Sequence, residues 1–372
     1  MIRHSTHTPV IFSRMGALVR QLAVGAVLAA TVSLMACAHV GGLSKDPPSD
    51  TAEMRLAAIR RAHVWAPTEV ASMDLMAGPS DPGAFPPNAT VTCDYVDKKM
   101  GGRSPKFTCV IPPDDELKVK FGPSNGEVYA EVAASRLFWA LGFGADHMYP
   151  VRVVCRGCPS NIQGTDVASI QRKMPGKEIE TATDSGWAWA ALDLVDPITD
   201  GAPRAERDAL KLLAVFIQHT DSKPEQQRLI CVGQQGKRQA GKPCAETFMM
   251  VHDLGLTFGH ANLFNRNSVG SVNLREWSHA SIWKNPARCV TNLPKSLTGT
   301  LKNPSITEAG RRFLADLLAQ LTDTQLHDLF DVARVTHRLG ATKGPAGGTT
   351  IEQWVDTFKQ KRSEIVNHTC PG

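Results

Sequence analysis

The sequence has little charge imbalance, no internal repeat and no zinc-protease signature. The net charge of +5 is small for 372 residues, and the basic residues are spread along the chain, so neither a nucleic-acid arm nor a membrane-binding patch is indicated. None of the twelve histidines falls in an H-E-x-x-H arrangement, which argues against a metalloprotease. What remains is a globular composition, with 42% hydrophobic and 21% charged residues.

The first forty residues differ in kind from the rest. Three arginines precede the uncharged run LAVGAVLAATVSLMA (residues 22–36), which is short for a membrane span but has the length and flanks of a signal-peptide core. The run ends in LMAC, which resembles a bacterial lipoprotein box and implies lipidation of Cys37. The stretch ACA also fits ordinary signal cleavage. We therefore expect a signal peptide over 1–37 and an exported cell-envelope lipoprotein, with a soluble periplasmic protein as the alternative.

Eight further cysteines support export independently, because an even set can pair completely in an oxidising compartment. The sequence does not fix their connectivity. The pairing of sequence neighbours joins Cys93 with Cys109, Cys155 with Cys158, Cys231 with Cys244, and Cys289 with Cys370.

The stretch CRGC (residues 155–158) is the one closely spaced cysteine pair. Turn-forming residues follow it, whereas a redox pair should open a helix that lowers the thiolate pKa. A zinc ribbon needs a second such pair, and Cys231 and Cys244 are too far apart in sequence to supply it. We expect a structural disulfide here.

Hydrophobic periodicity divides the remaining chain. Residues 38–89 contain a tether rich in Gly, Pro and Ser and a short helix within residues 49–65. From residue 90 the period changes to two, and TVTCDYV, KFTCVIP and ELKVKFG predict three strands of a small antiparallel sheet. A helix within residues 126–144 and two more strands complete a β-rich lobe over 90–180.

The chain becomes mainly helical from residue 204. Four segments carry helical periodicity, namely 204–220, 307–321, 323–335 and 351–366. The expected fold class is therefore α+β, with a small antiparallel β-rich N-terminal lobe and a larger, mainly helical C-terminal lobe over 181–372.

Four segments carry candidate chemistry, in a fixed order. GGRSPKF (101–107) is a glycine-containing hairpin tip, and ELKVKFG (116–122) is a strand with a lysine near its end. HTDSKPEQQ (219–227) follows an apolar helix, and MMVHDLGLTFG (249–259) is an apolar strand that runs into Asp-Leu-Gly. The last two resemble the catalytic loop and the D-F-G turn of protein kinases. Taken together, the order resembles a bilobal kinase-like fold, closest in pattern to the HipA-type kinases.

The resemblance implies roles for individual residues. Glu131 is the natural carboxylate partner of the strand lysine, with Glu127 in reserve, and Gln226 replaces the family's metal-binding Asn with a side chain one methylene longer. The implied catalytic residues are Asp221 and Lys223, the implied nucleotide-binding residues are Gly101, Gly102, Lys106, Lys120 and Glu131, and the implied metal ligands are Asp253 and Gln226.

The resemblance further implies a phosphotransferase that uses ATP, or another nucleoside triphosphate, with Mg²⁺ or Mn²⁺. The acceptor would be a hydroxyl group of a protein or small molecule, and the only membrane contact would be the lipid anchor. ATP is expected to be scarce outside the cytoplasm, so two alternatives stay open. One is a pseudokinase that binds a nucleotide or a partner, and the other is a structural envelope lipoprotein held by disulfides.

Overall fold

Five strands close into a barrel in the first half of the chain. The computed structural model describes residues 50–233, 244–259, 271–338 and 348–371, so the expected signal peptide, Cys37 and most of the tether lie outside the described residues. The strand order is β2-β3-β4-β6-β5, and β5 returns to β2. The strands are β2 (Ala89–Val96), β3 (Lys106–Ile111), β4 (Asp115–Phe121), β5 (His147–Arg156) and β6 (Ala168–Arg172).

The barrel differs from the small, wholly antiparallel sheet that the sequence predicts. The pairs β2 with β3 and β3 with β4 are antiparallel, as expected. However, β2 also pairs in parallel with β5, with Val91 opposite Val153. Both of these valines are buried in the apolar cluster inside the barrel. The parallel pairing therefore closes the sheet around its own apolar face.

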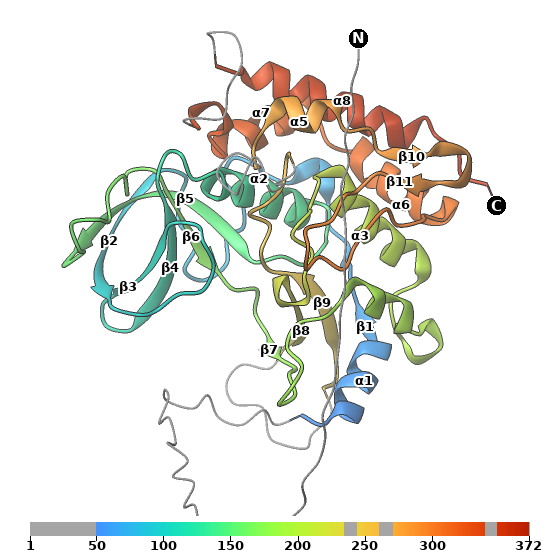
Figure 1. Ribbon diagram of the computed structural model, residues 1–372, viewed down its shortest axis with the longest axis horizontal. Helices are drawn as coiled ribbons and strands as arrows, with labels where there is room; N and C mark the ends of the chain where they lie inside the picture. The colour runs from blue at the N-terminus through green and yellow to red at the C-terminus, as the bar shows by residue number, and fades with distance from the viewer. Residues whose placement is uncertain (1–49, 234–243, 260–270, 339–347, 372) are drawn as a thin grey trace, which may run out of the picture. The chain divides into compact units, whose positions relative to one another are not determined.

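Helix α2 (Glu127–Ala140) lies beside the barrel (Figure 1). Nearly all of its residues are buried, because α2 packs between the barrel strands β4, β5 and β6 and the helix α7 (Asp323–Val332). The turn after α2 contains Gly142 with φ +82°, a left-handed conformation that glycine adopts without strain. This burial holds the polar residues of α2, including two glutamates, inside the protein.

A second sheet lies outside the barrel and has the order β1-β9-β8-β7. Its central strands, β8 (Gln227–Cys231) and β9 (Thr247–Val251), are fully buried. The outer strands, β1 (Ala62–His63) and β7 (Lys177–Glu178), have two residues each. Both central strands lie in the mainly helical C-terminal part of the chain, and β9 overlaps the apolar strand that the sequence predicts before Asp253.

The remaining elements are mostly helical, and Figure 1 shows α5, α7 and α8 together. Helix α3 packs against α6, and α8 packs against both α6 and α7. The helices are α1 (Ala52–Arg60), α3 (Arg204–Phe216), α5 (Leu274–His279), α6 (Glu308–Ala319) and α8 (Ile351–Val366), with a hairpin of β10 (Trp283–Asn285) and β11 (Val290–Thr291). Short 3₁₀ turns cover Val70–Ser72, Trp189–Leu194, Pro197–Thr199, Pro224–Gln226, Pro286–Arg288 and Val335–His337.

The structure confirms the mixed α+β class, with a β-rich region and a set of helices. The described residues all belong to one compact unit, Asp46–Gly372. Among the described residues, every helix is too short or too polar to cross a bilayer.

Four disulfides crosslink the described chain, and they are the pairs of sequence neighbours. Three of them close short loops, whereas the fourth joins cysteines 81 residues apart. The pairs are Cys93–Cys109, Cys155–Cys158, Cys231–Cys244 and Cys289–Cys370.

Candidate functional site

Strand β4 places Lys120 in a cluster of carboxylates. Its side chain is 1% exposed, and Nζ lies 2.5 Å from Oε1 of Glu131 and 2.7 Å from Oε2 of Glu127. Oδ1 of Asp253, in the loop after β9, is 3.6 Å from the same nitrogen. The two glutamates lie four residues apart on α2, so they share one face of the helix. The structure thus brings together Lys120, Glu131 and Asp253, and Glu127, the reserve partner in the sequence, contacts the same nitrogen as Glu131.

Burial and charge act against each other within this cluster. Burial raises the pKa of Glu131 to about 8, although Lys120 opposes the shift. Burial disfavours the charged form of Lys120, but Asp253, Glu131 and Glu127 outweigh it and hold the pKa of Lys120 well above its ordinary value. Burial likewise opposes ionisation of Asp253, and the positive charges of Lys120 and Lys118 outweigh it and hold that pKa well below its ordinary value. Lys120 is therefore a charged group in the protein interior.

The cluster carries more negative than positive groups. The carboxylate oxygens of Glu127, Glu131 and Asp253 lie within 4.8 Å of one another. Within the described residues, no donor reaches the buried Oε2 of Glu131. Oxygen ligands crowded in this way suit a hard divalent cation such as Mg²⁺ or Mn²⁺.

Two glycines pack closely against side chains of the candidate site, Gly255 against Glu127 and Gly102 against Lys106. A Cβ atom on Gly255 would lie 2.8 Å from Cγ of Glu127, and the Gly255 N–H donates to Oδ1 of Asp253 at 3.1 Å. Gly102 has φ +85°, and a Cβ atom there would lie 2.7 Å from Nζ of Lys106. Gly255 therefore lets the Asp-Leu-Gly turn approach α2, and Gly102 leaves room for Lys106.

Lys106 occupies the first position of β3, opposite Lys120 in the β3–β4 register. Burial lowers the pKa of Lys106, and the positive charges of Lys120 and Lys118 lower it further. Gly101, in the loop before β3, has open space around the position of a Cβ atom. Lys106 therefore lies at the base of the predicted glycine hairpin, and the charge of Lys120 lowers its pKa.

Asp221 lies in the loop after α3 and accepts hydrogen bonds on both carboxylate oxygens. Nε2 of Gln226 donates to Oδ2 at 2.8 Å, and Nζ of Lys223 is 3.4 Å from the same oxygen. Oγ of Ser296 donates to Oδ1 at 3.3 Å. The Asp221 side chain is 19% exposed. The loop thus presents a carboxylate with a neighbouring cation at a partly open position.

The backbone of Gln226 connects this loop to the Asp-Leu-Gly turn. Its carbonyl oxygen accepts the N–H of His252 at 2.8 Å and that of Asp253 at 3.3 Å. Gln227 and Val251 are partners in the antiparallel pairing of β8 with β9. The two loops are therefore neighbours because they flank the same pair of strands.

His219 and His252 are held by packing and backbone contacts. Burial lowers the pKa of His219 to about 4, despite the negative charges of Asp221 and Asp253. Burial also lowers the pKa of His252, and Nε2 of its ring lies 2.7 Å from the carbonyl oxygen of Glu225. His219 is therefore uncharged at neutral pH and packs beside Trp189.

Sequence reasoning missed Ser296. The segment around it aligns with the Asp221 loop through backbone bonds, since the Ser296 N–H donates to the Thr220 carbonyl at 2.9 Å and the Thr300 N–H to the Ser222 carbonyl at 3.0 Å. The local sequence KSLTGT carries no motif or periodicity that would place it there.

A G-x-S-x-G stretch, GPSNG (residues 122–126), joins β4 to α2. A nucleophile elbow would need a strained serine with a histidine within reach. Ser124 is exposed and does not have positive φ, and within the described residues no histidine hydrogen-bonds to it. Asn125 instead donates to the carbonyl of Phe121 and accepts the N–H of Glu127. The stretch is a turn that fixes the start of α2.

Comparisons with known proteins give a distant likeness to solved structures. No protein-family profile and no curated protein matches the chain. One similar solved structure is the Helicobacter pylori proinflammatory kinase CtkA, with a TM-score of 0.42 and 13% sequence identity. The match covers 76% of this chain and 96% of that one. A likeness at this level carries no conclusion about activity.

Proposed function

We propose that this chain is a kinase-like phosphotransferase. It would bind a nucleoside triphosphate with Mg²⁺ or Mn²⁺ and transfer a phosphoryl group to a hydroxyl acceptor. The observation that carries the proposal is the buried Lys120, which lies among Glu127, Glu131 and Asp253. A buried cation beside surplus carboxylates suits a site that receives both phosphate and metal.

Each candidate residue has a role that its surroundings support. Lys120 and Lys106 would bind phosphate oxygens, and Asp253 would hold the metal, with its carboxylate kept ionised by Lys120. The metal, when bound, neutralises negative charge on the phosphates. Asp221 would orient the acceptor hydroxyl and accept its proton, and Lys223 would place a positive charge beside it. Gly101 and Gly102 would let the backbone approach the phosphates.

A second candidate is a nucleotide-binding module without transfer. Its support is the hydrogen bond from Nε2 of Gln226 to Asp221. This bond commits the amide NH2 group of Gln226 and one oxygen of the proposed catalytic carboxylate, and so fixes the orientation of both side chains. Binding at Lys120 and Asp253 would then be retained while phosphoryl transfer is lost.

The four disulfides support a location in an oxidising compartment. We extend the proposal to an exported protein whose lipid anchor is Cys37. Phosphotransfer there would need ATP delivered to that compartment or a different phosphoryl donor.

Binding and transfer can be tested separately on the full, disulfide-intact chain. Calorimetry with a non-hydrolysable ATP analogue, with and without Mg²⁺, would measure binding for the native chain and for Asp253→Asn and Asp221→Asn. Incubation with ATP and a panel of protein and sugar acceptors, followed by mass spectrometry, would measure transfer. Asp316→Asn, on the exposed face of α6, is the matched control.

We expect metal-dependent binding that Asp253→Asn abolishes and Asp221→Asn retains. Transfer should fall by about 10²- to 10⁴-fold in Asp221→Asn, the usual contribution of a positioned general base. Binding without transfer would favour the second candidate. Absence of nucleotide binding by the native chain would refute both and favour a structural envelope protein.

A further inference from the structure

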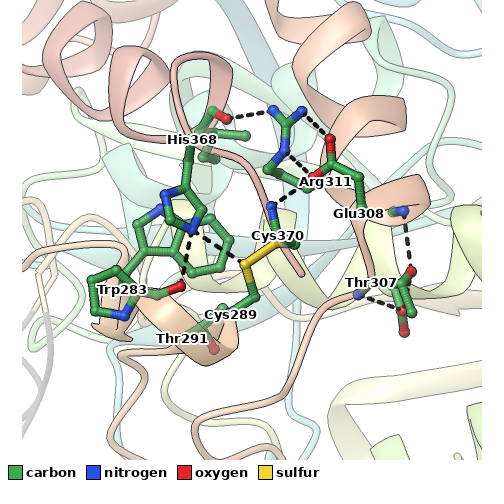
Figure 2. The surroundings of a disulfide bond; sticks show 12 residues. Trp283, Cys289, Thr291, Thr307, Glu308, Arg311, His368 and Cys370 are labelled. Atoms are coloured by element: carbon green, nitrogen blue, oxygen red, sulfur yellow. Dashed lines mark hydrogen bonds and ion pairs between the residues drawn. A yellow bond between two sulfur atoms is a disulfide. The ribbon is translucent and has the colours of Figure 1, made fainter. Parts of the chain in front are cut away.

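Three side chains that can ligate metal lie together where the segment after α8 contacts the segment after β10. The sulfur atoms of Cys289 and Cys370 and a ring nitrogen of His368 all lie within 4.8 Å of one another. Nε2 of His368 is 3.2 Å from Sγ of Cys289 and 3.1 Å from the carbonyl oxygen of Pro286. Figure 2 shows the imidazole ring beside the disulfide that joins the two cysteines.

The surroundings hold these three side chains in place. The ring of Trp283 lies against that of His368, with centroids 4.6 Å apart, and Nε1 of Trp283 donates to the carbonyl of Glu364 at 2.8 Å. The N–H of Cys370 donates to Oε2 of Glu308 at 2.8 Å. Both cysteines are buried. The histidine and the two cysteines are thus oriented by contacts other than the disulfide itself.

This combination is specific to one of the four disulfides. Within the described ranges, one other group of three possible ligands exists, and it consists only of carboxylates around Lys120. The pairs Cys93–Cys109, Cys155–Cys158 and Cys231–Cys244 have no third ligand placed in the same way among the described residues. Two thiolates and an imidazole form a ligand set that zinc prefers, with a fourth position left for water or an external donor.

We propose that the reduced chain binds one zinc ion through Cys289, His368 and Cys370. The same three residues then have two states, a disulfide beside a histidine and a zinc site. Each state ties the segment after α8 to the segment after β10. The zinc state belongs to the chain before oxidation or after exposure to a reductant, and it does not depend on the proposed phosphotransfer.

The interconversion balances with a dithiol as reductant. The dithiol gives two electrons and two protons to the Cys289–Cys370 bond and becomes a cyclic disulfide. The zinc ion then replaces the two thiol protons, which pass to solvent, and it binds the neutral imidazole of His368. A newly made chain needs no reductant, because its thiols have not yet been oxidised.

Metal titration of the full chain tests this proposal. The chain would be reduced with a phosphine under argon, freed of reductant and titrated with Co²⁺ and then Zn²⁺. The readouts are the thiolate-to-cobalt charge-transfer absorption, the number of metal ions per chain by native mass spectrometry, and circular dichroism. The variants are His368→Ala and the double variant Cys289→Ser/Cys370→Ser. Cys155→Ser/Cys158→Ser is the matched control, since it removes the same number of thiols.

We expect the reduced native chain and the matched control to bind one zinc ion with equal affinity. The double variant should lose this ion, and His368→Ala should bind it at least about tenfold more weakly, as loss of a contributing group commonly does at metal sites. The oxidised chain should not bind zinc here. Binding that survives in both variants would overturn the proposal. A reduced chain that loses the circular dichroism of its folded state, and does not regain it when zinc is added, would also overturn the proposal.

Discussion

Two ionic clusters in this protein are opposite in charge. Around Lys120, one cation faces three carboxylates from α2 and the loop after β9. Around Glu308, one carboxylate faces the guanidinium groups of Arg311 and Arg312 and the N–H of Cys370. Both clusters join segments that are far apart in the sequence, but they differ in how completely their polar atoms are paired.

Glu308 is fully paired, whereas the Lys120 cluster is not. Oε1 of Glu308 accepts from Arg311 and Arg312 at 2.8 Å each, and Oε2 accepts from Arg311 and the Cys370 N–H at 2.8 Å each. In the Lys120 cluster, Oε2 of Glu131 receives no donor within the described residues. A fully paired carboxylate stabilises the fold, while surplus buried carboxylates beside a lysine retain the capacity to bind a ligand.

The largest effect is expected when Lys120 is removed. Lys120→Met should lower the free energy of unfolding by about 3–5 kcal/mol, because the variant leaves buried carboxylates without their counter-charge. Asp253→Asn in the same chain should recover part of this loss, since Asp253 is the carboxylate that Lys120 keeps ionised. Urea unfolding of the disulfide-intact chains would measure both. A loss below about 1 kcal/mol would show that the cluster contributes no more than an exposed pair.

Glu308→Gln should have the next largest effect, about 1.5–3 kcal/mol at pH 7, because it replaces charge-assisted hydrogen bonds. Arg311 holds the pKa of Glu308 well below its ordinary value. The stabilisation is therefore complete above the unfolded-state pKa of about 4.3 and is lost as the pH falls through the folded-state value. Urea unfolding at pH 7 and pH 3 should show a smaller difference between native chain and variant at pH 3. An equal difference at both pH values would contradict this assignment.

Gly255→Ala should cost about 1–3 kcal/mol through overpacking. The added methyl group would lie 2.8 Å from Cγ of Glu127, so it would push the Asp-Leu-Gly turn away from α2. Gly101→Ala is the matched control, because open space surrounds that position. Thermal unfolding should separate the two variants, and equal midpoints would argue against a close approach at Gly255.

The smallest effect is expected for Arg312. Arg311 and Arg312 bind the same carboxylate, but their side chains are 7% and 69% exposed. Arg312→Ala should change the free energy of unfolding by less than about 1 kcal/mol, as exposed ion pairs do. Arg311→Ala should cost clearly more, because Arg311 also donates to the carbonyl of Ile365 at 2.7 Å. Urea unfolding would rank the two, and the reverse order would contradict the role of burial.

The local sequence predicts much of the fold and part of the site. The period-two segments before residue 122 correspond to β2, β3 and β4, and residues 351–366 form α8 as expected. The pairing of Lys120 with Glu131, which the family resemblance implied, is also a contact in the structure, since β4 and α2 follow one another directly in the chain. Glu127 was the second choice, yet it contacts the same nitrogen because helical geometry places residues four apart on one face.

The local sequence did not predict contacts between segments that are far apart in the chain. The parallel pairing of β2 with β5 depends on tertiary packing, since local alternation is the same in parallel and antiparallel strands. Ser296 reaches Asp221 through backbone bonds of an irregular segment, and such bonds carry no residue preference. Hydrogen bonding of Gln226 to Asp221 likewise depends on the side-chain conformations of both residues.

Closure of the five-stranded sheet also limits how other chains can bind. Each of its strands is paired on both sides, so the barrel has no free edge to which a foreign strand could be added. In the second sheet, the outer strands β1 and β7 have only two residues each, which leaves little backbone for such pairing. Association by strand addition, whether specific or through aggregation, therefore has few starting points in the described part of this chain.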